Sequence, residues 1–370
     1  MQESVTKLLL DEIRRNKLLW LLGFVPVLLA VETLKPEKHA LLFVLAILTI
    51  IPLAALISRA SEGIVAKTGD TLGALLNATL SNLTELIIAL TALQAGQYIL
   101  VKASIAGAIV TKTLFTLGAS LLAGGLKHRI QQYNRDSAHL QAGLLFLATI
   151  ALLVPSMMTD MDFEDSPSSY GHRLSLALSA LLIVSYGLSM LFALGTHREL
   201  FGSVAHAHGG EAAWPVGLSL TALAVATVLM AIASEIFVGS VQSAGDTFGM
   251  TPAFIGFIVV ALVSSIAELG PALSGARANR LDLSVGIALG GASQITLLVA
   301  PLLVFLSYVI GPTPMTLHFW PGAVFMVLVA TVTAAFVTNS GRSAWFIGVF
   351  VLNVYLILAI TLYLLPAQPQ

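Results

Sequence analysis

Eleven long apolar stretches run along almost the whole chain, separated only by short charged or Gly/Pro-rich breaks. A helix needs about 20 apolar residues to cross the hydrocarbon layer of a membrane. The chain is 57% hydrophobic and 10% charged, whereas a soluble domain carries about 25% charged residues. The sequence therefore predicts an all-α polytopic membrane protein. The predicted spans are Leu18–Val31, His39–Ser58, Gly73–Leu93, Leu100–Leu122, Ala138–Pro155, Leu174–Leu194, Val216–Val238, Pro252–Leu273, Leu283–Tyr308, His318–Val337 and Ala344–Leu364.

Basic residues are unequally shared between the two sets of loops, and this predicts the orientation in a cell (inner or plasma) membrane. Cytoplasmic loops carry an excess of Lys and Arg, so we expect a cytoplasmic N-terminus and, after eleven crossings, an external C-terminus. The first span follows a basic segment as in a signal peptide, but no small-x-small cleavage site closes it. We therefore interpret it as a membrane helix. Loops on the N-terminal side hold Lys7, Arg14, Arg15, Lys17, Arg59, Lys67, Lys127, Arg129, Arg135, Arg198, Arg277, Arg280 and Arg342, whereas the opposite loops hold Lys35, Lys38, Lys102 and Arg173.

The composition also excludes several classes of function. A net charge of −1 leaves no basic face for nucleic-acid phosphates. Cysteine is absent, which excludes disulfides and cysteine nucleophiles, and the sequence has no phosphate-binding loop or nucleophile elbow. We therefore expect no enzymatic activity, no cofactor and no nucleic-acid partner. The lipid bilayer, inorganic cations and protons remain as partners, and the sequence sets no oligomeric state.

The second half of the chain resembles the first. Ala60-Ser61-Glu62 recurs as Ala233-Ser234-Glu235, and a serine-rich helical turn ends in Glu85 and again in Glu268. Each half holds five spans, so the second copy enters the membrane inverted, an arrangement typical of transporters that work by alternating access. The alternative is an old duplication whose symmetry is only structural. The predicted division is an N-terminal segment with the first helix (1–38), a first five-helix repeat (39–195), a cytoplasmic linker (196–215) and a second five-helix repeat (216–370).

Three charged residues lie deep inside predicted spans: Glu85, Glu268 and Lys112. A charge at the bilayer centre costs about 2.5–3.5 kcal/mol, so such residues usually line a cavity or pair with one another. Glu85 and Glu268 approach the midplane from opposite sides, and two carboxylates facing one cavity suit a hard cation. The alternative is an ion pair with only a structural role, such as Glu85 with Lys112.

Oxygen-bearing side chains accompany both glutamates at helical spacing. We expect these groups to complete a cation site, with Gly107 and Gly290 opening room for backbone carbonyls of neighbouring helices. Glu62 and Glu235, near span ends, are candidate entrance acids or simply solvated helix-end residues. The predicted ligand groups are Ser81, Asn82, Thr84, Ser264, Ser265 and Gln294.

The same carboxylates predict proton coupling. Burial raises the pKa of a carboxyl group, whereas a bound cation lowers it. Cation binding and protonation therefore exclude one another, which is the thermodynamic basis of antiport.

The motifs around the two glutamates resemble those of the calcium/cation exchanger superfamily, specifically its proton-coupled branch. The resemblance rests on Leu72–Leu90 in the first half and on Phe254–Glu268 and Asp282–Pro301 in the second. It implies a ten-helix core preceded by one helix, exchanging calcium or another cation for protons. It also implies that Glu85 and Glu268 bind the cation and the proton.

The chain departs from the family pattern at several of these positions, most sharply at Lys112. The family's Gly-Asn pair before each glutamate is Ser81-Asn82 here and then Ser264-Ser265. Lys112 stands where the family has an uncharged polar residue. It could point into the site and leave a charge suited to a monovalent cation such as Na⁺ or K⁺, or carry the exchanged proton. Alternatively it faces away, or calcium transport has been lost.

We therefore predict a secondary active cation/proton antiporter that exchanges Ca²⁺, or a monovalent cation such as Na⁺ or K⁺, for H⁺ by alternating access. The alternative hypothesis is a degenerate homologue that binds cations as a sensor or scaffold without transporting them.

Overall fold

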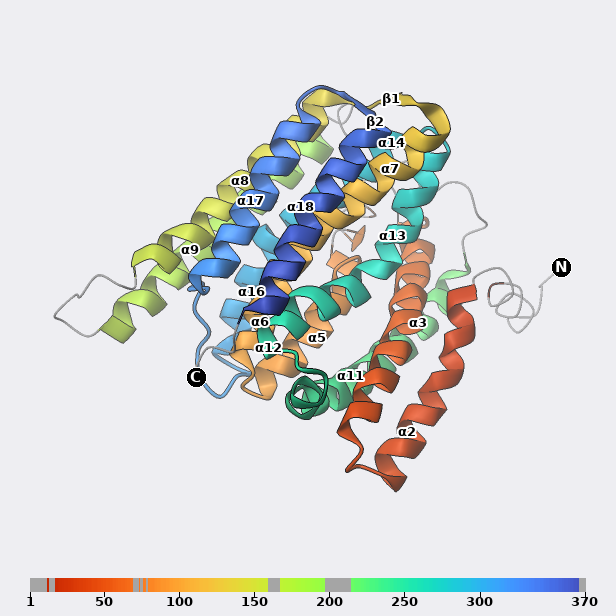
Figure 1. Cartoon of the computed structure of the whole chain (residues 1–370), viewed down its shortest axis with the longest axis vertical. Coiled ribbons are helices and arrows are strands. Elements are labelled where there is room, and N and C mark those ends of the chain that lie inside the picture. The colour runs from red at the N-terminus through yellow and green to blue at the C-terminus, as the bar shows by residue number, and fades with distance from the viewer. Residues whose placement is uncertain are drawn as a thin grey trace.

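The computed structural model describes residues 12, 17–68, 73, 76–77, 79–158, 167–196 and 214–365, and within these ranges it is almost entirely helical (Figure 1). Among the described residues, ten helices are long and apolar enough to cross a membrane, and one shorter apolar helix accompanies them. The fold class is therefore the predicted one. Most of the N-terminal segment before residue 17 and residues 197–213 of the predicted linker lie outside the described residues.

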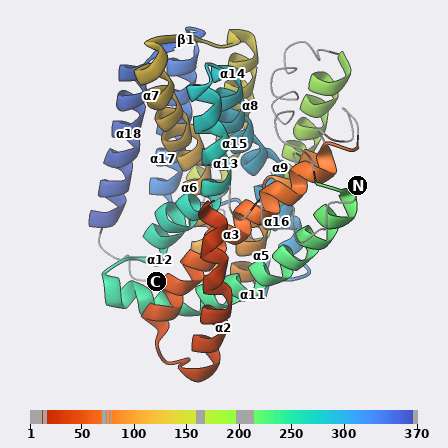
Figure 2. The ribbon, with the colours of Figure 1, turned by 90° about the vertical axis from the view of Figure 1, so that its right-hand side faces the viewer.

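The first helix of each half forms a pair that crosses one side of the molecule (Figure 2). Helix α3 (His39–Val65) and helix α11 (Val216–Phe248) make the most extensive helix–helix contact of the structure. The N-terminal span, a 3₁₀ segment η1 (Lys17–Gly23) followed by α2 (Phe24–Leu34), packs against α3. Both α3 and α11 are longer than their predicted spans, so they continue beyond the apolar stretch.

Within the described residues, a turn interrupts the third predicted span, Gly73–Leu93. Residues 79–80 are helical, Ser81 and Asn82 form a turn, and α5 (Leu83–Gln94) begins after it. Serine and asparagine side chains compete for backbone hydrogen bonds and so favour helix ends over helix interiors. The break places Asn82 at the N-cap of α5, although its side chain makes no capping bond.

Three spans around the centre contain π-helical turns, which insert an extra residue per turn and often mark functional positions. One span of the first half and two of the second have this form. The first consists of α6 (Tyr98–Val110), η2 (Thr111–Thr116) and α7 (Leu117–His128). The others consist of α12 (Pro252–Phe254), η5 (Ile255–Val260) and α13 (Ala261–Arg277), and of α14 (Leu281–Val285), η6 (Gly286–Gly290), α15 (Gly291–Gln294), η7 (Ile295–Val299) and α16 (Ala300–Ser307).

The remaining helices surround this centre. Helix α17 packs on α8, α18 packs on α7, and α16 packs on α9 (Figure 1). Each of these three pairs joins one helix from each half of the chain. Their bounds are α8 (Arg135–Met158), α9 (Pro167–Leu191) with the π-turn η3 (Phe192–Thr196), α17 (Pro321–Thr338) and α18 (Trp345–Leu364).

The loops gather at two ends of the bundle. At one end, β1 (Ile130–Gln132) pairs antiparallel with β2 (Arg342–Ala344), and the Gln131 amide donates to the Ala276 carbonyl. At the other end, the Tyr98 hydroxyl donates to the Thr313 carbonyl at 2.6 Å. These two groupings agree with the alternation of loops expected from the spans, so adjacent loops along the chain lie at opposite ends.

Candidate functional site

Lys112 stands at the centre of the bundle and is the largest fully buried side chain among the described residues. It projects from the π-helical turn η2, and its exposed fraction is 0%. Its Nζ lies 2.6 Å from Glu268 Oε1 and 3.4 Å from Glu85 Oε1, and it donates to Asn82 Oδ1 at 3.3 Å. The ammonium therefore faces three oxygens, and the possibility that Lys112 faces away is wrong.

The two glutamates come from opposite halves of the chain and meet at this ammonium. Glu85 lies in the first turn of α5, where the positive end of the helix dipole favours a negative charge, and Glu268 lies within α13. Their side chains are 9% and 15% exposed. Within the described residues, neither oxygen of Glu85 and only Oε1 of Glu268 takes part in a hydrogen bond. The cluster thus has buried carboxylate oxygens left over to bind another cation or a proton.

An amide bridge links the same centre to the second half. Asn82 Nδ2 donates to Gln294 Oε1 at 2.7 Å, and Ser81 Oγ donates to the same oxygen at 3.3 Å. Asn82 therefore joins Lys112 on one side to Gln294 on the other. The turn that breaks the third span is what frees the Asn82 side chain for this role.

Gly291 makes room for Lys112, whereas Gly290, expected to open room for a backbone carbonyl, does not meet a neighbouring backbone. A Cβ atom at Gly291 would lie 3.0 Å from Lys112 Cδ and 3.2 Å from Nζ, whereas at Gly290 the nearest atom, Gln141 Oε1, would be 3.7 Å away. The backbone approach expected at Gly290 is not found among the described residues, because only the Gln141 side chain lies within 4 Å of a Cβ there. Gly107 does allow a close backbone approach, since a Cβ there would overlap the Phe257 carbonyl of η5.

The other predicted ligand groups lie near the cluster without bonding to it. Ser264 Oγ donates to the carbonyl of Ala261 in its own helix, and the buried Ser265 hydroxyl has no hydrogen-bond partner within the described residues. Glu85 and Ser264 line a small cavity of about 10 Å³, about the space of one water. Thr84 is buried at 4% exposure, and among the described residues it makes no hydrogen bond to these groups.

The two candidate entrance acids lie outside the cluster. Glu62 forms an ion pair with Arg59 at 3.3 Å, one helical turn earlier in α3. Glu235 is exposed and lines a separate pocket between α2, α3 and α11, together with Glu32 and His39. In the described part of the chain, the hydrogen bonds and ion pairs of Lys112, Glu85 and Glu268 involve neither of these acids.

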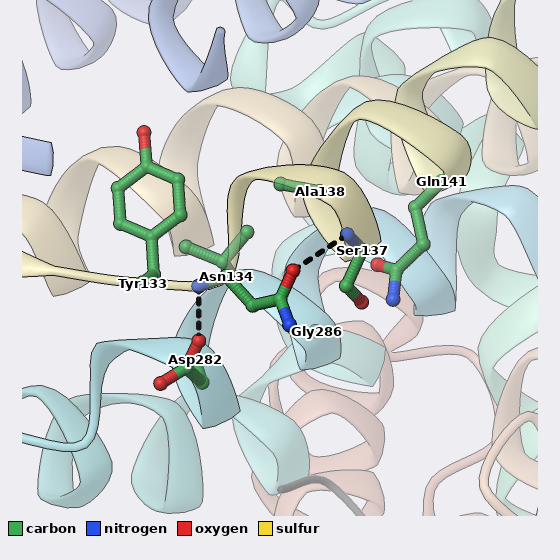
Figure 3. A pocket seen from close by; sticks show the side chains of 8 residues that line it. Tyr133, Asn134, Ser137, Ala138, Gln141, Asp282 and Gly286 are labelled. Atoms are coloured by element: carbon green, nitrogen blue, oxygen red, sulfur yellow. Dashed lines mark hydrogen bonds between the residues drawn. The ribbon is translucent and has the colours of Figure 1, made fainter. Parts of the chain in front are cut away.

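A second polar pocket, which sequence reasoning missed, lies where α8 begins (Figure 3). The Asn134 backbone N–H donates to Asp282 Oδ1, and the Ser137 N–H donates to Asn134 Oδ1 at 3.0 Å. Gln141, one turn further along α8, carries a buried Oε1 with no hydrogen-bond partner in the described part of the chain. The sequence contains Gln141 in one span and the pair Gly290-Gly291 in another. No pattern in the sequence shows that these residues face each other, so the pocket was not predicted.

The chemistry of this cluster suits the binding of cations. In the low-dielectric interior the two carboxylates attract any cation strongly, and Lys112 already supplies one positive charge. Among the described residues, no group of three or more His, Cys, Asp or Glu side chains could hold a metal ion. A further cation bound at the two glutamates would therefore share them with the ammonium and with amide and hydroxyl oxygens.

Comparison with known proteins gives consistent matches along the chain. The family model described as "Sodium/calcium exchanger protein" matches residues 38–195 and 218–364. A Ca(2+)/H(+) antiporter of Aphanothece halophytica is 34% identical over 95% of this chain and 97% of its own length. The Ca(2+)/H(+) antiporter ChaA of Bacillus subtilis is also 34% identical, over 88% of this chain and 93% of its own. The solved structure of native YfkE is similar, with a TM-score of 0.79, 32% identity, and coverage of 93% of this chain and 98% of that one.

Proposed function

Because this chain belongs to the sodium/calcium exchanger protein family, we propose that it is a secondary active antiporter that exchanges a cation for protons by alternating access. The relatives named above are antiporters and not enzymes, and the ten apolar helices identify an integral membrane protein. In the proposed orientation the N-terminus is cytoplasmic and the C-terminus external.

The convergence of Glu85 and Glu268 on one buried point carries this proposal. The two carboxylates come from helices of different halves, and both lie within 3.4 Å of the same nitrogen. Their oxygens that accept no hydrogen bond from the described residues can take either a proton or a cation. Since the cation repels the proton from the same carboxylates, binding of one promotes release of the other.

The position of the glutamates between the halves supports alternating access. A site at the contact of two inverted repeats can be opened to either side by rocking one repeat against the other. In the proposed cycle the protonated and the cation-bound forms both move between inward-facing and outward-facing states.

The relatives' names favour Ca²⁺ as the exchanged cation, while Lys112 favours a monovalent one. Lys112 also favours a second candidate function, a protein that binds cations as a sensor or scaffold without transport, because its ammonium already occupies the point where the carboxylates meet. The two candidate functions, antiporter and non-transporting cation binder, differ in whether the purified protein moves protons across a membrane.

The test is a proton-flux assay in liposomes loaded with a pH-sensitive dye, with Ca²⁺, Na⁺ or K⁺ added outside. We expect at least one of these cations to drive proton movement in the wild type, and Glu85→Gln and Glu268→Gln each to abolish it. Glu37→Gln is the matched control, because Glu37 is exposed in the turn between α2 and α3. Cation-dependent thermal stabilisation without proton flux would support the sensor instead, and unchanged flux in both glutamate variants would refute the proposal.

A further inference from the structure

Three formal charges meet in the middle of the bundle, and they do not cancel. Glu85 and Glu268 contribute −2 and Lys112 contributes +1, which leaves −1. Two other basic side chains of the first repeat have partners elsewhere: Arg59 pairs with Glu12 and Glu62, and Lys102 donates to the His318 carbonyl. The charge that a transported cation meets at the glutamates is therefore set by Lys112.

The environment of Lys112 matches a charged ammonium. An ammonium has three N–H donors and no acceptor, and Nζ faces three oxygens, those of Glu268, Asn82 and Glu85. A neutral amine would turn its lone pair toward one of these oxygens. The positive charge is thus a fixed part of the site.

The fold also holds this charge in place. The side chain is 0% exposed, and the missing side chain at Gly291 leaves the space that its Cδ and Nζ fill. Gly291 belongs to the opposite half of the chain. The space for the Lys112 side chain is therefore provided by a specific residue of that half.

From these observations we infer that Lys112 is a built-in counter-cation that restricts the site to monovalent cations. This inference rests on the proposed antiport function and specifies its substrate class. A monovalent cation brings the cluster to neutrality, because −1 and +1 cancel. A divalent cation would leave a net positive charge in a low-dielectric interior and would lie against an ammonium that cannot move away.

The test compares cation selectivity in the wild type and in Lys112→Asn, again by proton flux in dye-loaded liposomes. In the wild type we expect Na⁺ or K⁺ to drive proton movement at concentrations about tenfold or more below those needed for Ca²⁺, a difference of one order in affinity. Lys112→Asn removes the fixed charge and adds an amide oxygen. It should reverse the order and lower the half-maximal Ca²⁺ concentration by about tenfold or more.

Two further variants keep the test decisive. Lys112→Arg retains the charge and should keep the monovalent preference, whereas Lys112→Gln should behave like Lys112→Asn. Lys102→Gln is the matched control, because Lys102 is a second lysine of the same span that bonds to the His318 carbonyl, away from the glutamates.

A wild type that prefers Ca²⁺ to Na⁺ and K⁺ would overturn the inference and leave the antiport function standing, and this holds even if no Lys112 variant folds. The inference would also be overturned if Lys112→Asn kept the same order of preference among Na⁺, K⁺ and Ca²⁺ as the wild type. If neither the wild type nor any folded variant moves protons with any cation, the proposed function fails, and the inference fails with it.

Discussion

The two halves of the chain supply equivalent positions with different chemistry. Glu85 lies in the first turn of α5, directly after a break in its span, whereas Glu268 lies in the interior of α13. Three residues before each glutamate stand Asn82, which bonds to both Lys112 and Gln294, and Ser265, whose hydroxyl has no partner in the described residues. At this pair of positions, three residues before each glutamate, the first half supplies the side chain that is hydrogen-bonded to the site.

The asymmetry is strongest in the spans that follow. Twenty-seven residues after Glu85 comes Lys112, and the same distance after Glu268 comes Ile295; twenty-three residues after each glutamate come Ala108 and Gly291. One half supplies a charge and the other supplies the space for it. The two repeats have therefore diverged at equivalent positions, and this divergence allows a single lysine to pair with the two central glutamates.

The largest expected effect separates the two glutamates. Removing one partner of a buried ion pair costs about 3–5 kcal/mol, and Glu268 is the nearer partner of Lys112. Glu268→Gln should therefore lower the free energy of unfolding more than Glu85→Gln. Denaturant unfolding of both variants in detergent measures this difference, and an equal or larger loss in Glu85→Gln would contradict the assignment of the closer pair.

A double-mutant cycle sharpens the same comparison. Lys112→Met and Glu268→Gln should each destabilise the protein, but together they leave no unpaired charge between the two positions. We expect a coupling energy of about 1–3 kcal/mol, the range for groups in direct contact. Additive losses would mean that the two side chains do not interact in the folded protein.

Much of this architecture was predictable from the sequence, because long apolar runs leave few alternatives to membrane helices. The repeat and the buried glutamates were also sufficient to indicate a shared site. The direction of Lys112 was not predictable, since every face of its span is apolar and no periodicity marks the inner one. Of the two glycines expected to allow a backbone approach, Gly107 does lie against the Phe257 carbonyl, whereas Gly290 meets only the Gln141 side chain. The ion pair of Glu62 with Arg59 was readable from their i, i+3 spacing, whereas the division at residues 39–195 and 216–370 stays a prediction.

A smaller effect distinguishes two adjacent glycines. Gly291→Ala places a methyl group 3.0 Å from Lys112 Cδ, and overpacking of this kind costs about 1–3 kcal/mol. Gly290→Ala meets nothing closer than 3.7 Å and should cost less. Thermal unfolding of the two variants provides the comparison. In a Lys112→Ala background the penalty at Gly291 should shrink, because only the contact with Glu268 Oε2 at 3.3 Å would then remain. A larger loss of stability in Gly290→Ala than in Gly291→Ala would contradict the packing of Lys112 against Gly291.

The smallest effect concerns the two residues that precede the glutamates. Asn82→Ala removes bonds to Lys112 and Gln294 and should cost about 1 kcal/mol, a typical value for side-chain hydrogen bonds inside membrane proteins. Ser265→Ala removes a hydroxyl without a partner and should change stability by less than about 0.5 kcal/mol. Equal losses in the two unfolding experiments would show that the hydrogen bonds of Asn82 do not distinguish it from Ser265.

An experimentally determined structure of the wild-type protein, at a resolution that shows side chains, tests most directly whether the two glutamates converge on Lys112. We predict that Lys112 Nζ lies within hydrogen-bonding distance of Glu268 and within ion-pair distance of Glu85, with Gly291 against the lysine stem. A Lys112 side chain directed toward lipid, or carboxylates too far apart to share one cation, would contradict this central claim.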